Sequence, residues 1–281
     1  MSPARDVFTQ EIIRHKLLAI ADEMLVVLTR TSMSPIVYEI LDCSTGVTDG
    51  EGRVVAQTDT NLVFTAGVGP QIRAVIDKFG RPDIGPGDVF LTNLPAAGAS
   101  HLTDVCAVKP IVFGGALVAF AAATAHWADV GGKVPGSLAP DAVEIYQEGL
   151  QLPVVRVARE GRLNRDVVDI IQANVRLPDR AMGDLNAQLA ATQLAEKRLH
   201  ELFERYSLEI VCETFGAILD HGERLTRLEL RRVRNGVYQA ADFIDGDGLS
   251  GDAIPVRATV TIEDESMTID FTGTAPQARG R

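Results

Sequence analysis

Two stretches of the chain place apolar residues at helical spacing. Within residues 7–30, apolar side chains recur every three or four positions, which predicts an amphipathic helix that docks on the body of the protein. Residues 163–232 carry two further stripes, at 199–206 and 210–219, and Ser207 is placed to cap the second of these helices. A short helix is expected at 71–79, ended by Gly80.

Alternating apolar and polar residues predict strands on both sides of the helical stretch. The Asp49-Gly50 pair is a strong hairpin signal, and the turn at 113–115 predicts a second hairpin. Before the helices, the predicted strands lie within 44–56 and at 89–91, 105–112, 116–125 and 152–157; after them they lie at 236–243, 256–262 and 266–271.

This order predicts an α+β fold, with mixed or antiparallel sheets and a long helical region between two strand-rich parts, because alternating βαβ units are absent. We expect three regions. Residues 1–162 form a strand-rich region with an N-terminal helix, 163–235 form the long-helix region, and 236–281 begin a second strand-rich part that is cut short.

Composition narrows the class of protein. Of the 281 residues, 46% are hydrophobic, which is enough for a sizeable core. The balance of 27 basic and 38 acidic side chains, 27 − 38 = −11, argues against nucleic acid as a partner. Three dispersed cysteines, no signal peptide and no apolar run of about 20 residues predict a cytoplasmic protein that does not enter a membrane.

The strongest candidate for chemistry is a pair of histidines at the two ends of the second predicted hairpin. His101 and Asp104 stand three residues apart just before the outgoing strand, and His126 ends the return strand. A hairpin brings its ends together, so all three side chains can converge. Two imidazoles and a carboxylate can bind a divalent metal and leave coordination positions open. The alternative is that this HxxD pair, a common spacing, is an ordinary surface feature.

Two acidic residues are further candidates for catalysis. Asp129 either supplies a fourth ligand or orients His126 from outside the metal shell. Glu148 either reaches the site or is a solvated loop charge. Trp127 and Cys106 are better explained as packing residues than as a substrate platform and a nucleophile. No phosphate-binding motif is present, since the glycine-rich segment 131–137 does not fit GxxxxGK[ST].

The sequence resembles the hydantoinase B/oxoprolinase family along its whole length, as the N-terminal part of a longer subunit. The resemblance rests on LTRTSMSP at 28–35, DGEGRVVAQ at 49–57, GDVFLTN at 87–93, HLTDV at 101–105, AHWADVGG at 125–132, QEGLQLP at 147–153, GDLNAQ at 183–188 and DFTGT at 270–274. Shorter matches occur at 135–137 and 174–176. So many ordered matches make the resemblance specific.

The resemblance implies a metal held by His101, Asp104 and His126, with Mn, Zn or Fe as the candidate ions. It also implies a hetero-oligomer in which a separate, ATP-binding A-type subunit phosphorylates the substrate carbonyl. The expected activity is ATP-dependent hydrolysis of a cyclic amide, of the hydantoinase or 5-oxoprolinase type. ATP-dependent carboxylation of a ketone, as in acetone and acetophenone carboxylases, is the alternative, and a non-catalytic truncated partner is a third.

Two segments depart from the family pattern. Where relatives commonly read Asn-Asp-Pro-Tyr with glycines, residues 93–98 here lack the acid and the aromatic, and residues 61–67 lack a histidine that relatives commonly carry. We expect both departures to affect the substrate and not the metal triad.

Overall fold

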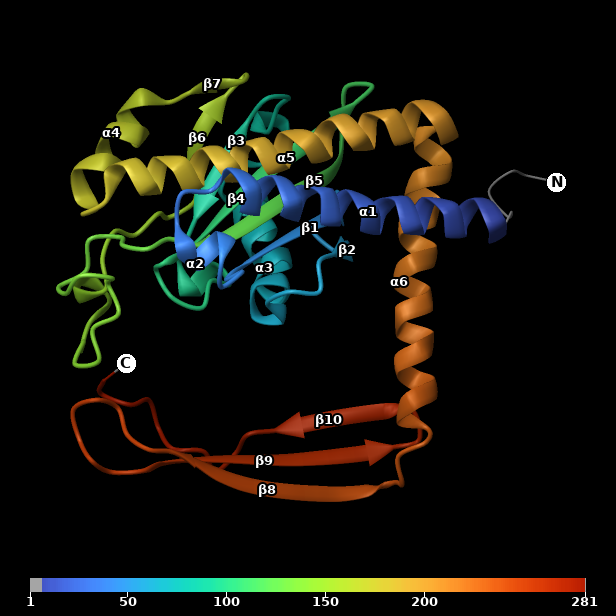
Figure 1. Ribbon diagram of the computed structural model, residues 1–281. Coiled ribbons are helices and arrows are strands. Elements are labelled where there is room, and N and C mark those ends of the chain that lie inside the picture. The colour runs from blue at the N-terminus through green and yellow to red at the C-terminus, as the bar shows by residue number, and fades with distance from the viewer. Residues whose placement is uncertain (1–6, 281) are drawn as a thin grey trace.

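The computed structural model describes residues 7–280, and a seven-stranded antiparallel sheet lies at its centre. The strand order is β2-β1-β5-β4-β3-β6-β7 (Figure 1). The strands are β1 (Cys43–Asp49), β2 (Val54–Gln57), β3 (Val89–Thr92), β4 (Asp104–Phe113), β5 (Ala116–His126), β6 (Val155–Arg159) and β7 (Arg162–Leu163). Both predicted hairpins are present, as β1–β2 and β4–β5.

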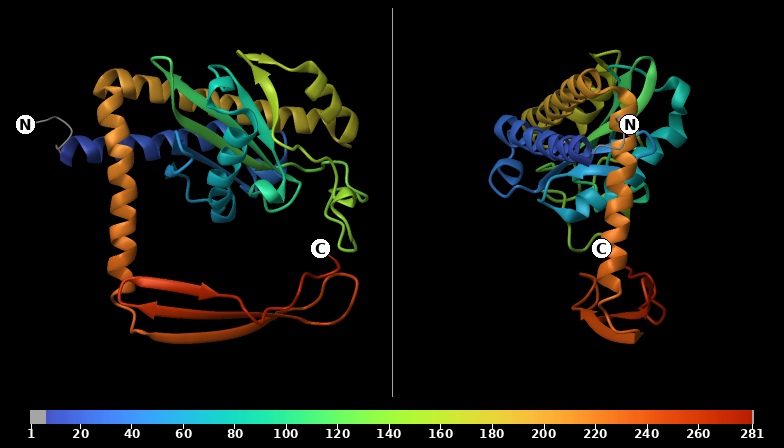
Figure 2. Two further views of the ribbon diagram at one scale, coloured as in Figure 1. Left: turned by 180° about the vertical axis from the view of Figure 1, so that it is seen from behind. Right: turned by 90° about the vertical axis from the view of Figure 1, so that its right-hand side faces the viewer.

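Helices cover both faces of this sheet. Figure 1 shows α1 (Val7–Thr31) and α5 (Pro178–Tyr206) side by side in front of it, and the view from behind in Figure 2 shows α3 (Leu62–Phe79) on the opposite face. The shorter helical elements are α2 (Pro35–Tyr38), η2 (Arg81–Asp83), η3 (Pro95–Ala97), η4 (Ile145–Gln147) and α4 (Arg165–Asn174). No helix within residues 7–280 is both long and apolar enough to span a membrane.

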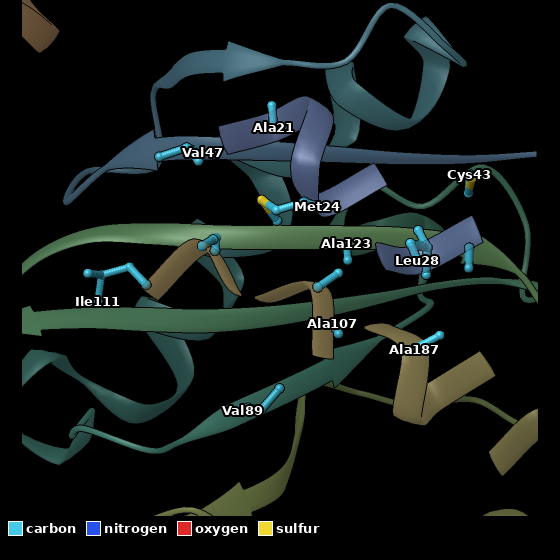
Figure 3. Packing of buried hydrophobic residues seen from close by; sticks show 14 of the residues in the cluster. Ala21, Met24, Leu28, Cys43, Val47, Val89, Ala107, Ile111, Ala123 and Ala187 are labelled. Carbon is cyan, nitrogen blue, oxygen red and sulfur yellow. The ribbon is translucent and has the colours of Figure 1, made fainter. Parts of the chain in front are cut away.

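Strand β5 is buried on both faces, which explains its nearly continuous apolar sequence. Ala121 and Ala123 face the cluster under α1 and α5, whereas Phe120 and Ala122 face the cluster under α3. Successive side chains of a strand point to opposite faces, so a strand between two helical layers is apolar at nearly every position. Small alanines let α1 and α5 approach the sheet closely, as the packing around Ala123 shows (Figure 3).

A buried polar contact fixes α5 to the central hairpin. The side-chain amide of Gln188 donates to the carbonyls of Val105 at 2.7 Å and Ala123 at 2.8 Å. Its oxygen accepts from the indole N–H of Trp127 at 3.0 Å. Both side chains are fully buried, so Trp127 is a packing residue, as expected from the sequence. Every polar atom of this amide has a partner, which removes the cost of burying it.

The helix at 71–79 begins earlier than predicted. The structure starts α3 at Leu62, through two glycines and Pro70 that disfavour a helix. Tertiary packing overrides this preference: a Cβ at Gly67 would lie 2.1 Å from the carbonyl oxygen of Gly98, so only glycine allows the close approach of α3 to the loop before the predicted site. The last predicted strand of the first region is also displaced, since β6 starts at Val155 and ends at Arg159.

The C-terminal part leaves the body of the molecule through α6 (Leu208–Leu230), whose N-terminus is capped by Ser207 as predicted. It continues in a separate antiparallel sheet of order β10-β9-β8, formed by β8 (Gly236–Ile244), β9 (Ile254–Glu263) and β10 (Ser266–Asp270) (Figure 1). This sheet exposes large apolar side chains, among them Val237, Phe243, Ile244, Met267 and Ile269. Its outer strands β8 and β10 are open edges, which favour pairing with further chain.

The Gln188 contact generates a stability prediction. In Gln188→Leu, the indole N–H of Trp127 and two strand carbonyls lose their partner inside the core, and we expect the free energy of unfolding to fall by about 3 kcal/mol or more. Gln193→Leu, on the exposed face of the same helix, should change it by no more than about 0.5 kcal/mol. Equal denaturation midpoints for the two variants would contradict the role of Gln188.

Candidate metal centre

The sheet brings His101, Asp104 and His126 together at one end of the central hairpin. Asp104 is the first residue of β4 and His126 the last of β5, and the two are cross-strand partners. His101 lies one turn earlier, with its carbonyl accepting from the N–H of Asp104 at 3.0 Å. The N–H of Trp127 donates to the carbonyl of Thr103 at 2.8 Å, which ties the two segments beyond the hairpin. The convergence expected from the sequence is therefore present.

The donor atoms of these three side chains point at one another. Nδ1 of His101 lies 3.0 Å from Oδ2 of Asp104, and Nδ1 of His126 lies 3.0 Å from Oδ1 of the same carboxylate. All three ligand atoms lie within 4.8 Å of one another, and the imidazole rings meet edge to face with centroids 5.0 Å apart. Within residues 7–280 no other group of three such ligands converges in this way.

Burial makes the Asp104 carboxylate unusual. Its side chain is 1% exposed, and Oδ2 lies 3.0 Å from Nδ1 of His101, a nitrogen that Oγ1 of Thr103 also approaches at 2.7 Å. Burial raises the pKa of Asp104, but the imidazoles of His101 and His126 outweigh this and hold the pKa below its ordinary value. A buried, ionised carboxylate with two imidazole nitrogens beside it has the chemistry of a cation ligand.

A fourth polar residue, Asp42, reaches the site, and nothing in the sequence predicted it. Its Oδ2 lies 3.4 Å from Nδ1 of His126, and its Oδ1 accepts from the side-chain amide of Asn61 at 2.9 Å. The β1–β5 pairing places it there, since Cys43 pairs with Ala125 and the N–H of His126 donates to the Asp42 carbonyl at 3.0 Å. Asp42 and His126 are joined only by the sheet, so no spacing rule could have linked them.

The structure places Asp129 in the loop after the centre and not beside His126. Oδ1 accepts from the N–H groups of Gly131 and Arg176, and Oδ2 accepts from the N–H of Gly136 and the Arg176 guanidinium at 2.9 Å. Burial raises the pKa of Asp129, but these backbone and guanidinium donors together hold it below its ordinary value. Its carboxylate shapes the loop, while His126 takes its partners from Asp104 and Asp42. A catalytic role for Asp129 stays a prediction.

Glu148 lies in the same loop, at the end of η4, and its side chain is half-buried. It does not belong to the cluster of His101, Asp104 and His126, so its catalytic role also stays a prediction. Cys106 is fully buried, and burial raises the pKa of its thiol to about 12, which leaves no thiolate nucleophile at neutral pH.

These features define an α+β protein with a histidine-carboxylate cluster at the end of a central antiparallel hairpin. The sequence matches the family Hydantoinase B/oxoprolinase over residues 6–281, and the chain belongs to that family.

Two relatives from Pseudomonas are named as subunits of enzymes. A protein of Pseudomonas sp. (strain NS671), named as the B-type subunit of a D-/L-hydantoinase, is 32% identical, over 97% of this chain and 47% of the relative. The beta subunit of caprolactamase from Pseudomonas jessenii is 32% identical, over 94% of this chain and 45% of the relative. The chain thus spans about half the length of these relatives.

Solved structures agree with the fold. The ATP-dependent caprolactamase from Pseudomonas jessenii superposes with a TM-score of 0.92 at 31% identity, covering 98% of this chain and 47% of that one. A nucleotide-free acetone carboxylase superposes with a TM-score of 0.89, covering 98% of this chain and 38% of that one. At 19% identity the second likeness concerns the fold alone.

The position of Asp129 generates a second stability prediction. Asp129→Asn removes the ion pair with Arg176 and one acceptor for the Gly136 N–H, and we expect a loss of about 2–4 kcal/mol of unfolding free energy at pH 7. Folding lowers the pKa of Asp129. Its carboxylate therefore stabilises the folded state fully above the pKa that it has in the unfolded chain, about 4. This stabilisation is lost as the pH falls through the lower pKa of the folded state.

The difference between parent and variant should therefore shrink when denaturation is repeated below about pH 4. Asp141→Asn, which alters only a solvent-exposed pair with Lys133, is the control and should leave unfolding nearly unchanged. If the difference in unfolding free energy between the parent and Asp129→Asn stays constant across the acid range, the stabilising role of the ionised Asp129 is contradicted.

Proposed function

We propose that this chain is the metal-holding part of a B-type subunit of an ATP-dependent cyclic-amide hydrolase, with a divalent metal bound by His101, Asp104 and His126. The observation that carries the proposal is the convergence of three ligand atoms, all within 4.8 Å of one another, around the buried carboxylate of Asp104. The names of the relatives support the reaction class, because one is named for a hydantoinase and another for a caprolactamase.

The spacing of the donors suits a metal. Two ligands each about 2.1 Å from a tetrahedral ion lie about 3.4 Å apart. The separations of Asp104 from His101 and His126 are 3.0 Å, and Asp42 lies 3.4 Å from His126. We assign Asp42 as a fourth oxygen beside the triad. A set of two imidazoles and two carboxylates suits Zn, Mn or Fe better than a hard cation that prefers oxygen alone.

The protein residues have distinct roles in this proposal. When bound, the metal acts as a Lewis acid and a template for the carbonyl carbon under attack. Asp104 holds both imidazoles by one carboxylate, so the two rings keep a fixed relative position. The side-chain amide of Asn61 donates to Oδ1 of Asp42, so that Oδ2 of Asp42 faces His126. The sheet fixes this arrangement before the substrate enters, as preorganised catalysis requires.

Activation of the substrate is assigned to a partner. No phosphate-binding motif occurs in the sequence, and the solved caprolactamase is described as ATP-dependent. We infer an A-type subunit that binds ATP and phosphorylates the amide oxygen, which makes the carbonyl carbon more electrophilic. Ketone carboxylation is the second candidate, favoured only by the shared fold with acetone carboxylase.

Metal binding is the first test. Elemental analysis of the purified protein should find about one divalent ion per chain, and His126→Ala or Asp104→Asn should lose it, because the first removes a nitrogen ligand and the second removes the negative charge of the central carboxylate. His15→Ala, an exposed histidine on α1, is the control and should retain the metal. Full occupancy in His126→Ala would contradict the centre, and a parent protein that never binds metal would favour a non-catalytic role.

Turnover is the second test. The isolated chain should hydrolyse no ATP, whereas the full subunit with its ATP-binding partner should open a cyclic amide with stoichiometric release of phosphate. His126→Ala should lower kcat at least about 100-fold through loss of the metal-assisted step. Product analysis with bicarbonate and a ketone is the comparison, and carboxylation of the ketone without cyclic-amide hydrolysis would replace the leading function by the second candidate.

A further inference from the structure

An open pocket adjoins the candidate metal centre. Its volume is about 560 Å³, and it is formed by the turn that follows α2 and the segment that begins α3. Asp42 belongs to both features, since it lines the pocket and its Oδ2 lies 3.4 Å from Nδ1 of His126. Pockets for small molecules commonly have volumes of about 300–1,000 Å³. The pocket is thus large enough for a small substrate, and it adjoins the centre through Asp42.

Most of the remaining pocket wall is apolar. Ile40 and Leu41 contribute from one side, and Leu62 and Val63 from the first turn of α3. All four are exposed, with 70% of Ile40 and 62% of Val63 accessible. Four neighbouring aliphatic side chains left in solvent indicate a binding surface, because isolated exposed residues would not gather around one hollow.

The backbone of this turn is strained where it meets the centre. Leu41 has φ of 60°, a left-handed conformation that is unfavourable for a residue other than glycine. Hydrogen bonds on both sides hold the turn: the N–H of Asp42 donates to the carbonyl of Ile36 at 3.0 Å, and that of Cys43 to the carbonyl of Leu41 at 2.8 Å. The turn places the carboxylate of Asp42 toward His126 while the Leu41 side chain stays at the pocket.

The charge of the pocket excludes one class of ligand. Its lining contains the carboxylates of Asp42 and Asp59 and no lysine, arginine or histidine. A divalent ion at the centre would be balanced by Asp42 and Asp104, so Asp59 leaves the site with net negative charge. A carboxylate on the substrate ring would meet no basic side chain in the pocket wall and would be repelled by the uncompensated charge of Asp59.

We infer that this pocket binds the aliphatic ring of an uncharged cyclic amide and discriminates against ring carboxylates, with Val63 and its apolar neighbours as specificity-determining residues. The inference rests on the proposed function and narrows its substrate class to neutral lactams and hydantoins. It assigns the exposed apolar side chains to the substrate and not to the ATP-binding partner.

The test compares 2-pyrrolidinone with 5-oxoproline, which share one ring and differ by a carboxylate. In the complete two-subunit assembly we expect kcat/KM to favour 2-pyrrolidinone at least about tenfold. Val63→Lys places a cation at the pocket and should shift this ratio toward 5-oxoproline by about tenfold, the size of one partly screened charge interaction at close range. Val26→Lys, on α1 and 57% exposed, is the matched control outside the pocket lining and should leave the ratio within about twofold.

A binding measurement separates failure of the pocket from failure of the function. Ligand-observed NMR on the metal-loaded protein without ATP should give the same preference and the same reversal in Val63→Lys. If Val63→Lys reverses the binding preference between the two rings, the inference is supported even when the assembly opens no cyclic amide. Absence of ring opening would contradict only the hydrolase proposal. The inference is overturned if wild type binds both rings equally, or if Val63→Lys abolishes assembly with the partner while selectivity stays unchanged.

Discussion

The pairing of β4 with β5 is the constraint on which the rest of the structure depends. This register sets Asp104 opposite His126 at the open end of the hairpin. It also directs successive apolar side chains of the strands to two separate helical layers, one on each face of the sheet. A shift by one residue would turn every side chain of a strand to the other face. It would therefore bury the wrong residues under α1 and α5 and separate the donors of the centre at the same time.

Polar groups inside the core tie the helices to this register. Gln188 bonds to both strands of the hairpin and to Trp127, which directly follows His126, so α5 is fixed to the segment that carries the centre. The loop beyond Trp127 is held in turn by Asp129 and Arg176. The buried amide of Gln188 and the buried carboxylate of Asp129 each have hydrogen-bond partners, which offset the cost of burying them. The centre thus lies on rigid elements, while the wall formed by the turn after α2 and the start of α3 remains open to ligands.

The described chain has two parts with different surfaces. The body buries its apolar residues between helices and the seven-stranded sheet, whereas the three-stranded sheet beyond α6 leaves apolar side chains and both edges exposed. Relatives of about twice the length share this fold, as the caprolactamase superposition shows. An unpaired sheet with an apolar face is marginal by itself in water.

The sequence by itself determined the α+β order of elements, both hairpins, the long α1, and the meeting of His101, Asp104 and His126, because each follows from local periodicity or from a hairpin that returns to its start. Tertiary structure decided the rest. Helix α3 starts at Leu62 because Gly67 packs against Gly98, against the local preference of its sequence. Asp42 joins His126 only through the β1–β5 pairing, and the pocket forms only where α3 meets the turn after α2. Contacts between segments so far apart depend on packing, which residue spacing along the chain does not encode.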